Sequence, residues 1–110
     1  MREARGPVDA YVAGSAGPKP EILPLMHERG VAVMGSDTGN DVQPTGCERF
    51  SNPVHQVGIV GMGLWILDNA WLDDLAEACA ARNRWHFLIS ILPLNLPSVT
   101  GSPVNPVATF

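Results

Sequence analysis

The residues of this chain best suited to chemistry are one histidine and one acid. His55 stands two positions after Pro53, and Asp68 directly follows the apolar run 64–67. Imidazole is the commonest protein ligand for divalent transition metals, and a carboxylate can serve as a ligand or as a base. A proline restricts the backbone before the histidine, and an acid at the end of a strand can approach it. The spacing therefore suggests that the two side chains converge as part of a polar site.

Each candidate also has a plainer interpretation. A lone histidine is more often a hydrogen-bonded polar residue than a metal ligand, and Asp68 could simply cap the helix expected after it. Asp37 follows an apolar strand, and its place in or outside the site stays open. His27 and His86 fit surface or strand-face positions and are given no role.

The apolar pattern predicts alternating helices and strands, and hence the α/β class. A helix over 20–30 begins with prolines, ends at Gly30 and is expected to pack through Ile22, Leu25 and Met26. A buried strand over 31–34 follows, then a long loop over 38–53 that must be functional or mobile. Residues 1–20 form a loop-rich lead-in, with at most a short strand at 11–12.

The second half of the chain repeats this alternation. A helix is expected from Pro53 to about Val60, followed by a strand over 64–67. Residues 68–69 can cap the next helix, whose first turn contains two acids and whose apolar face comprises Leu72, Leu75, Ala76 and Cys79. A strong strand over 85–92 ends at prolines.

Composition limits the possible functions. With 110 residues, 45% of them hydrophobic, and with 11 Gly and 10 Pro, the chain is at most one loop-rich globular domain. A net charge of −4 without a Lys/Arg cluster argues against a nucleic-acid partner. No apolar run approaches the roughly 18 residues of a membrane helix, and the first residues lack the apolar core of a signal peptide. Cys47 and Cys79 stand in unlike contexts and favour free thiols in a reduced, cytoplasmic protein over a disulfide.

A glycine-rich segment at 57–66 offers a rival site because it begins like a dinucleotide-binding turn. Gly61 and Gly63 suit the first two glycines of that pattern, but Ile66 occupies the third position, where a small residue is needed. No acid follows the next strand to hold a ribose. Cys47 is a weaker candidate still, since nothing in the sequence places a base beside it. A dinucleotide-binding fragment is therefore the less favoured alternative hypothesis.

An ordered series of motifs carries a family resemblance over residues 21–110. The series comprises Gly-Val-Ala-Val-Met-Gly-Ser-Asp-Thr at 30–38, Pro-Val-His at 53–55, Ile-Leu-Asp-Asn at 66–69 with Leu72 and Leu75, Pro-Leu at 93–94, and Thr-Gly-Ser-Pro-Val-Asn-Pro-Val-Ala at 100–108. In this order it resembles the carboxyl-terminal half of the cyclase family that includes the bacterial kynurenine formamidases. The resemblance implies a metal-dependent amidohydrolase of tryptophan catabolism, or a related enzyme, with a swivelling β/β/α fold, bound zinc or manganese, and an oligomeric state.

The resemblance also implies that the site is incomplete. The family's His-x-Gly-Thr-His-x-Asp-x-Pro segment supplies most metal ligands and the catalytic histidine, and this chain contains no such segment. His55 and Asp68 match the family's later ligands, with Asp68 standing where glutamate is common. We therefore expect a partial β/β/α domain over 21–110 that lacks its amino-terminal half, and no catalytic residue can be named.

Two functional hypotheses follow. The first is a fragment of an arylformamidase-like hydrolase that acts on an amide or formamide bond of a small molecule in its complete form and is inactive alone. The second is a non-catalytic half-domain that binds a partner or its own copy. Neither hypothesis involves nucleic acid or a membrane.

Overall fold

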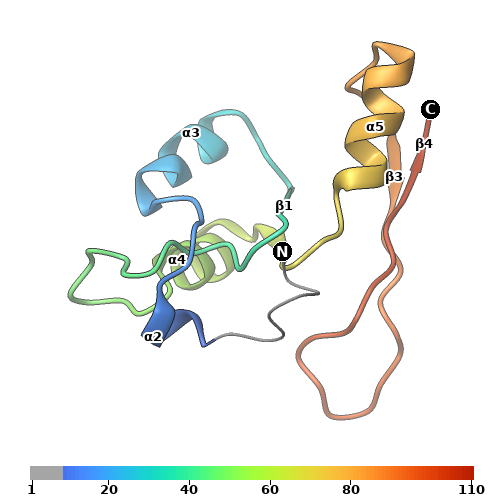
Figure 1. The fold of residues 1–110 in the computed structure, drawn as a ribbon. Coiled ribbons are helices and arrows are strands. Elements are labelled where there is room, and N and C mark those ends of the chain that lie inside the picture. Colours follow the sequence, from blue (N-terminus) through green and yellow to red (C-terminus); the bar gives the residue numbers. More distant parts are fainter. Residues whose placement is uncertain (1–8) are drawn as a thin grey trace. The chain divides into compact units, whose positions relative to one another are not determined.

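The computed structural model describes residues 9–110, which divide into two compact units between Trp71 and Leu72. The first unit contains α2 (Ala10–Ala13), the 3₁₀ helix η1 (Pro20–Ile22), α3 (Leu23–Glu28), β1 (Val33–Gly35), α4 (Pro53–Met62) and β2 (Trp65–Leu67) (Figure 1). The second contains α5 (Asp73–Arg82), β3 (Leu88–Ser90) and β4 (Val107–Thr109). Helices and strands alternate from α3 to β3, so the predicted α/β class is confirmed.

The first unit is built on a β-α-β arrangement. Strands β1 and β2 pair in parallel, with Val33 opposite Trp65 and Gly35 opposite Leu67, and α4 lies between them in the sequence. The small core consists of Leu23, Val54 and Leu64, with four partly buried side chains packed against it: Met26, Met34, Met62 and Ile66. Burial of these apolar side chains joins α3, α4 and both strands.

Helix α4 has boundaries that its sequence explains. Pro53 occupies its first turn, where a missing backbone N–H costs nothing, and Gly63 ends it in the left-handed region with φ of 67°. Within the helix, a Cβ on Gly58 would lie 3.2 Å from Leu64, so glycine lets the core close. The two glycines of the dinucleotide pattern, Gly61 and Gly63, therefore lie inside α4 and at its carboxyl-terminal cap. A dinucleotide-binding turn needs them between a strand and a helix, so that alternative is wrong.

The second unit is a helix followed by a two-stranded antiparallel sheet. Asp73 and Asp74 lie in the first turn of α5, as predicted, and favour its positive end. Strands β3 and β4 pair from Leu88 opposite Thr109 to Ser90 opposite Val107. The ring of Phe110 lies near that of Phe87, with centroids 5.4 Å apart, and the Arg82 guanidinium lies 4.8 Å from the Phe110 centroid. These contacts close the end of the sheet on α5.

Several predicted elements differ from the structure. Residues 11–12 lie in helix α2 instead of a strand. Leu23, rather than Leu25, is buried in α3, because the 3₁₀ turn before it rotates the helix relative to a simple α-helical projection. Strand β1 begins at Val33 and is largely exposed, since within the described residues only β2 pairs with it. The expected strand over 85–92 is limited to 88–90, and β4 was not expected, because its partner lies across a proline-rich connection.

Candidate functional site

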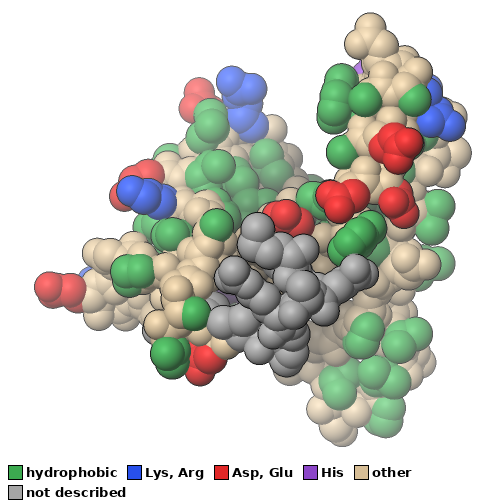
Figure 2. Space-filling model, viewed as in Figure 1, with side chains coloured by type: hydrophobic (Ala, Val, Ile, Leu, Met, Phe, Trp, Pro, Cys, Tyr) green, Lys and Arg blue, Asp and Glu red, His purple; other side chains and the backbone are tan. Residues whose placement is uncertain are grey.

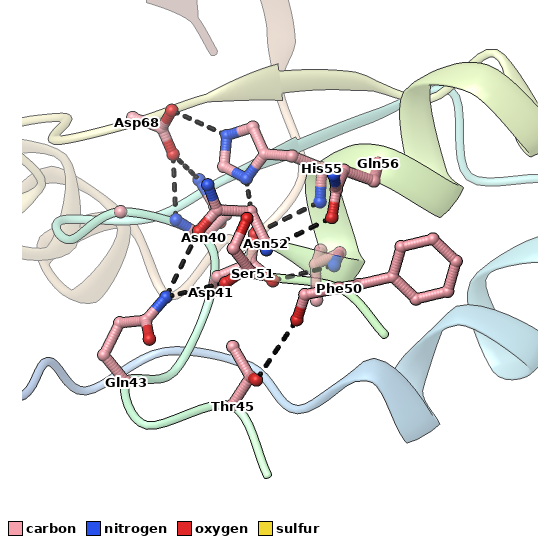
Figure 3. A network of polar contacts seen from close by, with 12 residues as sticks. Asn40, Asp41, Gln43, Thr45, Phe50, Ser51, Asn52, His55, Gln56 and Asp68 are labelled. Carbon is pink, nitrogen blue, oxygen red and sulfur yellow. Dashed lines mark hydrogen bonds and ion pairs between the residues drawn. The ribbon is translucent and has the colours of Figure 1, made fainter. Parts of the chain in front are cut away.

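The polar site of the first unit centres on His55. The side chain projects from the first turn of α4, and both ring nitrogens face carboxylates: Nδ1 lies 2.6 Å from Oδ2 of Asp41, and Nε2 lies 2.9 Å from Oδ2 of Asp68 (Figure 3). His55 and Asp68 were predicted to converge, and they are in contact. Asp41, which was not predicted, contacts the other side of the ring.

Asp68 is held by a second residue that the sequence did not reveal. The backbone N–H and the side-chain Nδ2 of Asn40 both donate to Oδ1 of Asp68 at 2.8 Å, and Nδ2 also donates to the Leu67 carbonyl at 2.8 Å. Oδ2 of Asp68 is thereby directed toward His55. Asp68 does not cap a helix: the N-cap of α5 is Leu72, which makes no side-chain capping bond. The capping interpretation of Asp68 is wrong because the helix begins further along the chain.

Backbone hydrogen bonds position this network just beyond Gly35 and Leu67, the last residues paired between β1 and β2. The Ser36 N–H donates to Leu67 at 3.1 Å, and the Asn69 and Ala70 N–H groups donate to Thr38 and Ser36, both at 2.9 Å. Residues 36–40 therefore run beside 67–70. This brings Asn40 to Asp68, so the long loop 38–53 is part of the site.

Residues 15–18 of the lead-in form backbone hydrogen bonds with residues 42–43 of the loop over 38–53. Ser15 and Gln43 exchange two backbone hydrogen bonds, at 3.0 and 2.9 Å, and the Val42 N–H donates to Pro18 at 3.3 Å. A Cβ on Gly17 would lie 2.7 Å from the carbonyl carbon of Asp41, so only glycine permits this approach. Residues 15–18 thus help to place Asp41.

Burial differs across the network. Asn40 is fully buried and the Asp41 side chain is 5% exposed, whereas the side chains of His55 and Asp68 are 28% and 36% exposed. Oδ1 of Asn40 is buried and has no hydrogen-bond partner among the described residues. Asp37 is exposed and takes no part in the network. The two partly open side chains are the ones that a ligand could reach.

Contacts within the network raise the pKa of His55 and lower that of Asp68. Burial lowers the pKa of His55, but hydrogen bonds to Asp41 and Asp68 and the charges of both carboxylates outweigh it, so the net shift is upward from 6.5. Burial raises the pKa of Asp68, but hydrogen bonds from Asn40 and His55 outweigh it, so the net shift is downward from 3.8. The pair therefore favours an imidazolium beside a carboxylate when no metal ion is bound.

The donor atoms fit part of a metal site. Two ligands of one tetrahedral zinc ion, each at about 2.0–2.2 Å from it, lie about 3.4 Å apart. The 2.9 Å between Nε2 and Oδ2 is a hydrogen-bond distance, so the two atoms would need to separate by only about 0.5 Å to hold the ion. Nitrogen and carboxylate oxygen suit zinc or manganese. Within residues 9–110, however, no group of three or more His, Cys, Asp or Glu side chains is arranged to hold an ion. Within the described residues, Nε2 of His55 and Oδ2 of Asp68 are thus two neighbouring donor atoms without a third beside them.

Other features of the described residues do not add to this site. A hollow of about 520 Å³ is lined by residues 43–51 and includes none of the four network residues. Cys47 is half-buried within it and Cys79 is buried in α5; both are free thiols. No helix in the described part of the chain is both long and apolar enough to cross a membrane.

Comparison with known proteins gives a similarity among solved structures. No protein-family model matches the chain, and no curated protein matches it. Among solved structures, it is similar to a crystal structure described as that of a novel cyclase, with 30% sequence identity and a TM-score of 0.76. The similarity covers 88% of this chain and 31% of the cyclase. The chain therefore has the fold of part of a cyclase and spans less than a third of that protein's length.

Proposed function

We propose that this chain is the carboxyl-terminal part of a cyclase-family, metal-dependent hydrolase, in which His55 and Asp68 are two ligands of a zinc or manganese ion. The observation that carries the proposal is the 2.9 Å contact between Nε2 of His55 and Oδ2 of Asp68, each held from behind by a buried residue. The similarity to part of a cyclase supports it. The kynurenine formamidase resemblance suggests an aryl formamide or related amide as substrate.

The residues of this chain would bind and orient the ion. Nε2 and Oδ2 supply two neighbouring donor atoms on the partly exposed side of the network. When bound, such an ion polarises a carbonyl group and activates water for its hydrolysis. His55 must lose a proton to become a ligand, so its raised pKa makes binding compete with protonation.

Two ligands also imply that the chain is inactive alone. Catalytic zinc sites hold about three protein ligands and keep an open position for water. The buried, unpartnered Oδ1 of Asn40 supports completion of the site by groups outside the described residues, because buried acceptors are rarely left unsatisfied. We infer that the complete form, expected to be a cytoplasmic oligomer, combines these residues with an amino-terminal half.

The test restores that half. The chain joined to an amino-terminal segment with the His-x-Gly-Thr-His-x-Asp-x-Pro motif should hydrolyse an aryl formamide in a metal-dependent reaction, whereas the chain alone should not. In the joined protein, His55→Ala should abolish activity and Asp68→Asn should reduce it strongly. Asp37→Asn is the matched control, since Asp37 is exposed and outside the network. Full activity in His55→Ala would refute the assignment.

A non-catalytic role in binding a partner or a second copy is the alternative, and exposed apolar surface favours it. Trp65 in β2 is 71% exposed, Leu88 in β3 is 68% exposed, and Leu92 beyond it is 79% exposed. Figure 2 shows hydrophobic side chains on the surface of the face in view. Parallel strands are normally covered on both faces, so β1 and β2 present surface that another polypeptide could cover.

A further inference from the structure

We propose that Asp41 is a positioning residue that keeps the proton of the neutral His55 ring on Nδ1 and so leaves the lone pair on Nε2. This role deepens the proposed function, and it rests on that function only in taking Nε2 as the atom that binds the metal ion. The arrangement itself concerns this chain's own residues. It assigns a role to a loop acid that lies fourteen positions before the histidine it holds.

Asp41 joins the ring to the start of helix α4. Its Oδ1 accepts the Val54 N–H at 2.7 Å, and its Oδ2 accepts the backbone N–H of His55 at 3.2 Å and lies 2.6 Å from the ring Nδ1. Asn52, the N-cap by position, makes no side-chain capping bond, so Asp41 supplies the cap from a distant loop. The same carboxylate thus fixes the backbone and the ring of His55.

The two carboxylates beside the ring are not equivalent. Asp41 is almost fully buried and its contact with Nδ1 is the shorter, whereas Asp68 is 36% exposed and lies 2.9 Å from Nε2. A hydrogen bond to a charged acceptor is stronger where water is excluded. In the neutral ring the proton is therefore retained at Nδ1, and the Nε2 lone pair is left on the partly exposed side of the ring, beside Asp68. Histidine ligands are commonly oriented by such a carboxylate on their other nitrogen.

Asp41→Asn tests this assignment because it exchanges one acceptor oxygen for a donor. The amide oxygen can still accept the Val54 N–H, but the NH₂ group then faces Nδ1 and favours the proton on Nε2. Nitrogen NMR of ¹⁵N-histidine-labelled, metal-free chain, at a pH where the ring is neutral, reports which nitrogen is protonated. The His55 signals are identified by their loss in His55→Gln.

We expect a protonated Nδ1 and an unprotonated Nε2 in the natural sequence and in the control Asp37→Asn, and the reverse in Asp41→Asn. Asp41→Ser, which can cap the helix but cannot reach the ring in the same way, should give a mixture of both tautomers. It keeps the proposal testable if Asp41→Asn does not fold. An unchanged tautomer in a folded Asp41→Asn or Asp41→Ser protein, or the same change in Asp37→Asn, would overturn the proposal.

A zinc titration separates this inference from the proposed function. In the protein joined to the amino-terminal segment, with zinc alone as probe, Asp41→Asn should weaken zinc binding by about 10- to 100-fold, as is typical when the residue behind a histidine ligand is lost. A reversed tautomer with unchanged zinc binding would support positioning by Asp41 and count against His55 as a ligand. An unchanged tautomer would refute the positioning role whatever the zinc affinity.

Discussion

Gly17→Ala should destabilise the chain and disturb His55, although Gly17 contacts neither His55 nor Asp68. A Cβ at this position would lie 2.7 Å from the carbonyl carbon of Asp41 and 2.8 Å from the Val42 nitrogen, and both are backbone atoms that cannot rotate away. Reaching an ordinary contact of 3.4 Å needs a shift of about 0.7 Å in the segment that contains Asp41. Overpacking of this kind costs about 1–3 kcal/mol.

The shift should also weaken the cap on α4, because Asp41 accepts the Val54 N–H at 2.7 Å. Urea unfolding gives the change in free energy, and hydrogen exchange of the Val54 amide reports the cap directly. Gly39→Ala is the matched control: it lies close to Asp41 in sequence, yet a Cβ there meets nothing within 4 Å. It should change stability by no more than about 0.5 kcal/mol. A Gly17→Ala protein as stable as the natural chain, with an equally protected Val54 amide, would refute this account of the loop.

Three further predictions concern the isolated chain. The two pKa shifts predict a range of pH in which the free energy of unfolding is highest. The contribution of His55 to stability is complete below pH 6.5 and is lost as the pH rises through its raised folded-state pKa. The contribution of Asp68 is complete above pH 3.8 and is lost as the pH falls through its lowered folded-state pKa. Urea unfolding at several pH values should show both losses, and His55→Gln should remove the alkaline one; an alkaline loss that persists in that variant would assign it elsewhere. Calorimetric zinc titration should find no sub-micromolar site, because two ligands are too few, and a tight site abolished by His55→Ala would contradict the incomplete-site hypothesis. Size-exclusion chromatography should find oligomers or aggregates, because apolar side chains of β2 and β3 are exposed, whereas a sharp monomer peak with cooperative unfolding would indicate a self-sufficient domain.

Local sequence determined the position of α4 and the choice of the two candidate ligands. Pro53 and the glycines after it act within a turn or two of the backbone, so the position of α4 follows from nearby residues. The acids in the first turn of α5 act over a similarly short range. His55 and Asp68 could be selected because few residue types bind metals and because strand β2 ends just before the acid. Their use as metal ligands stays a prediction.

Tertiary structure decided what surrounds those ligands. Asn40 and Asp41 lie in a loop without periodicity, and their partners are 28 and 14 positions away, so no local pattern indicates the contacts. The contacts arise because backbone hydrogen bonds hold residues 36–38 against 67–70 where β1 and β2 end, and because Gly17 admits the backbone of Asp41. Likewise, β4 is a strand only because β3 pairs with it. Sequence by itself identified the side chains that could do chemistry, whereas long-range backbone pairing determined which residues hold them in place.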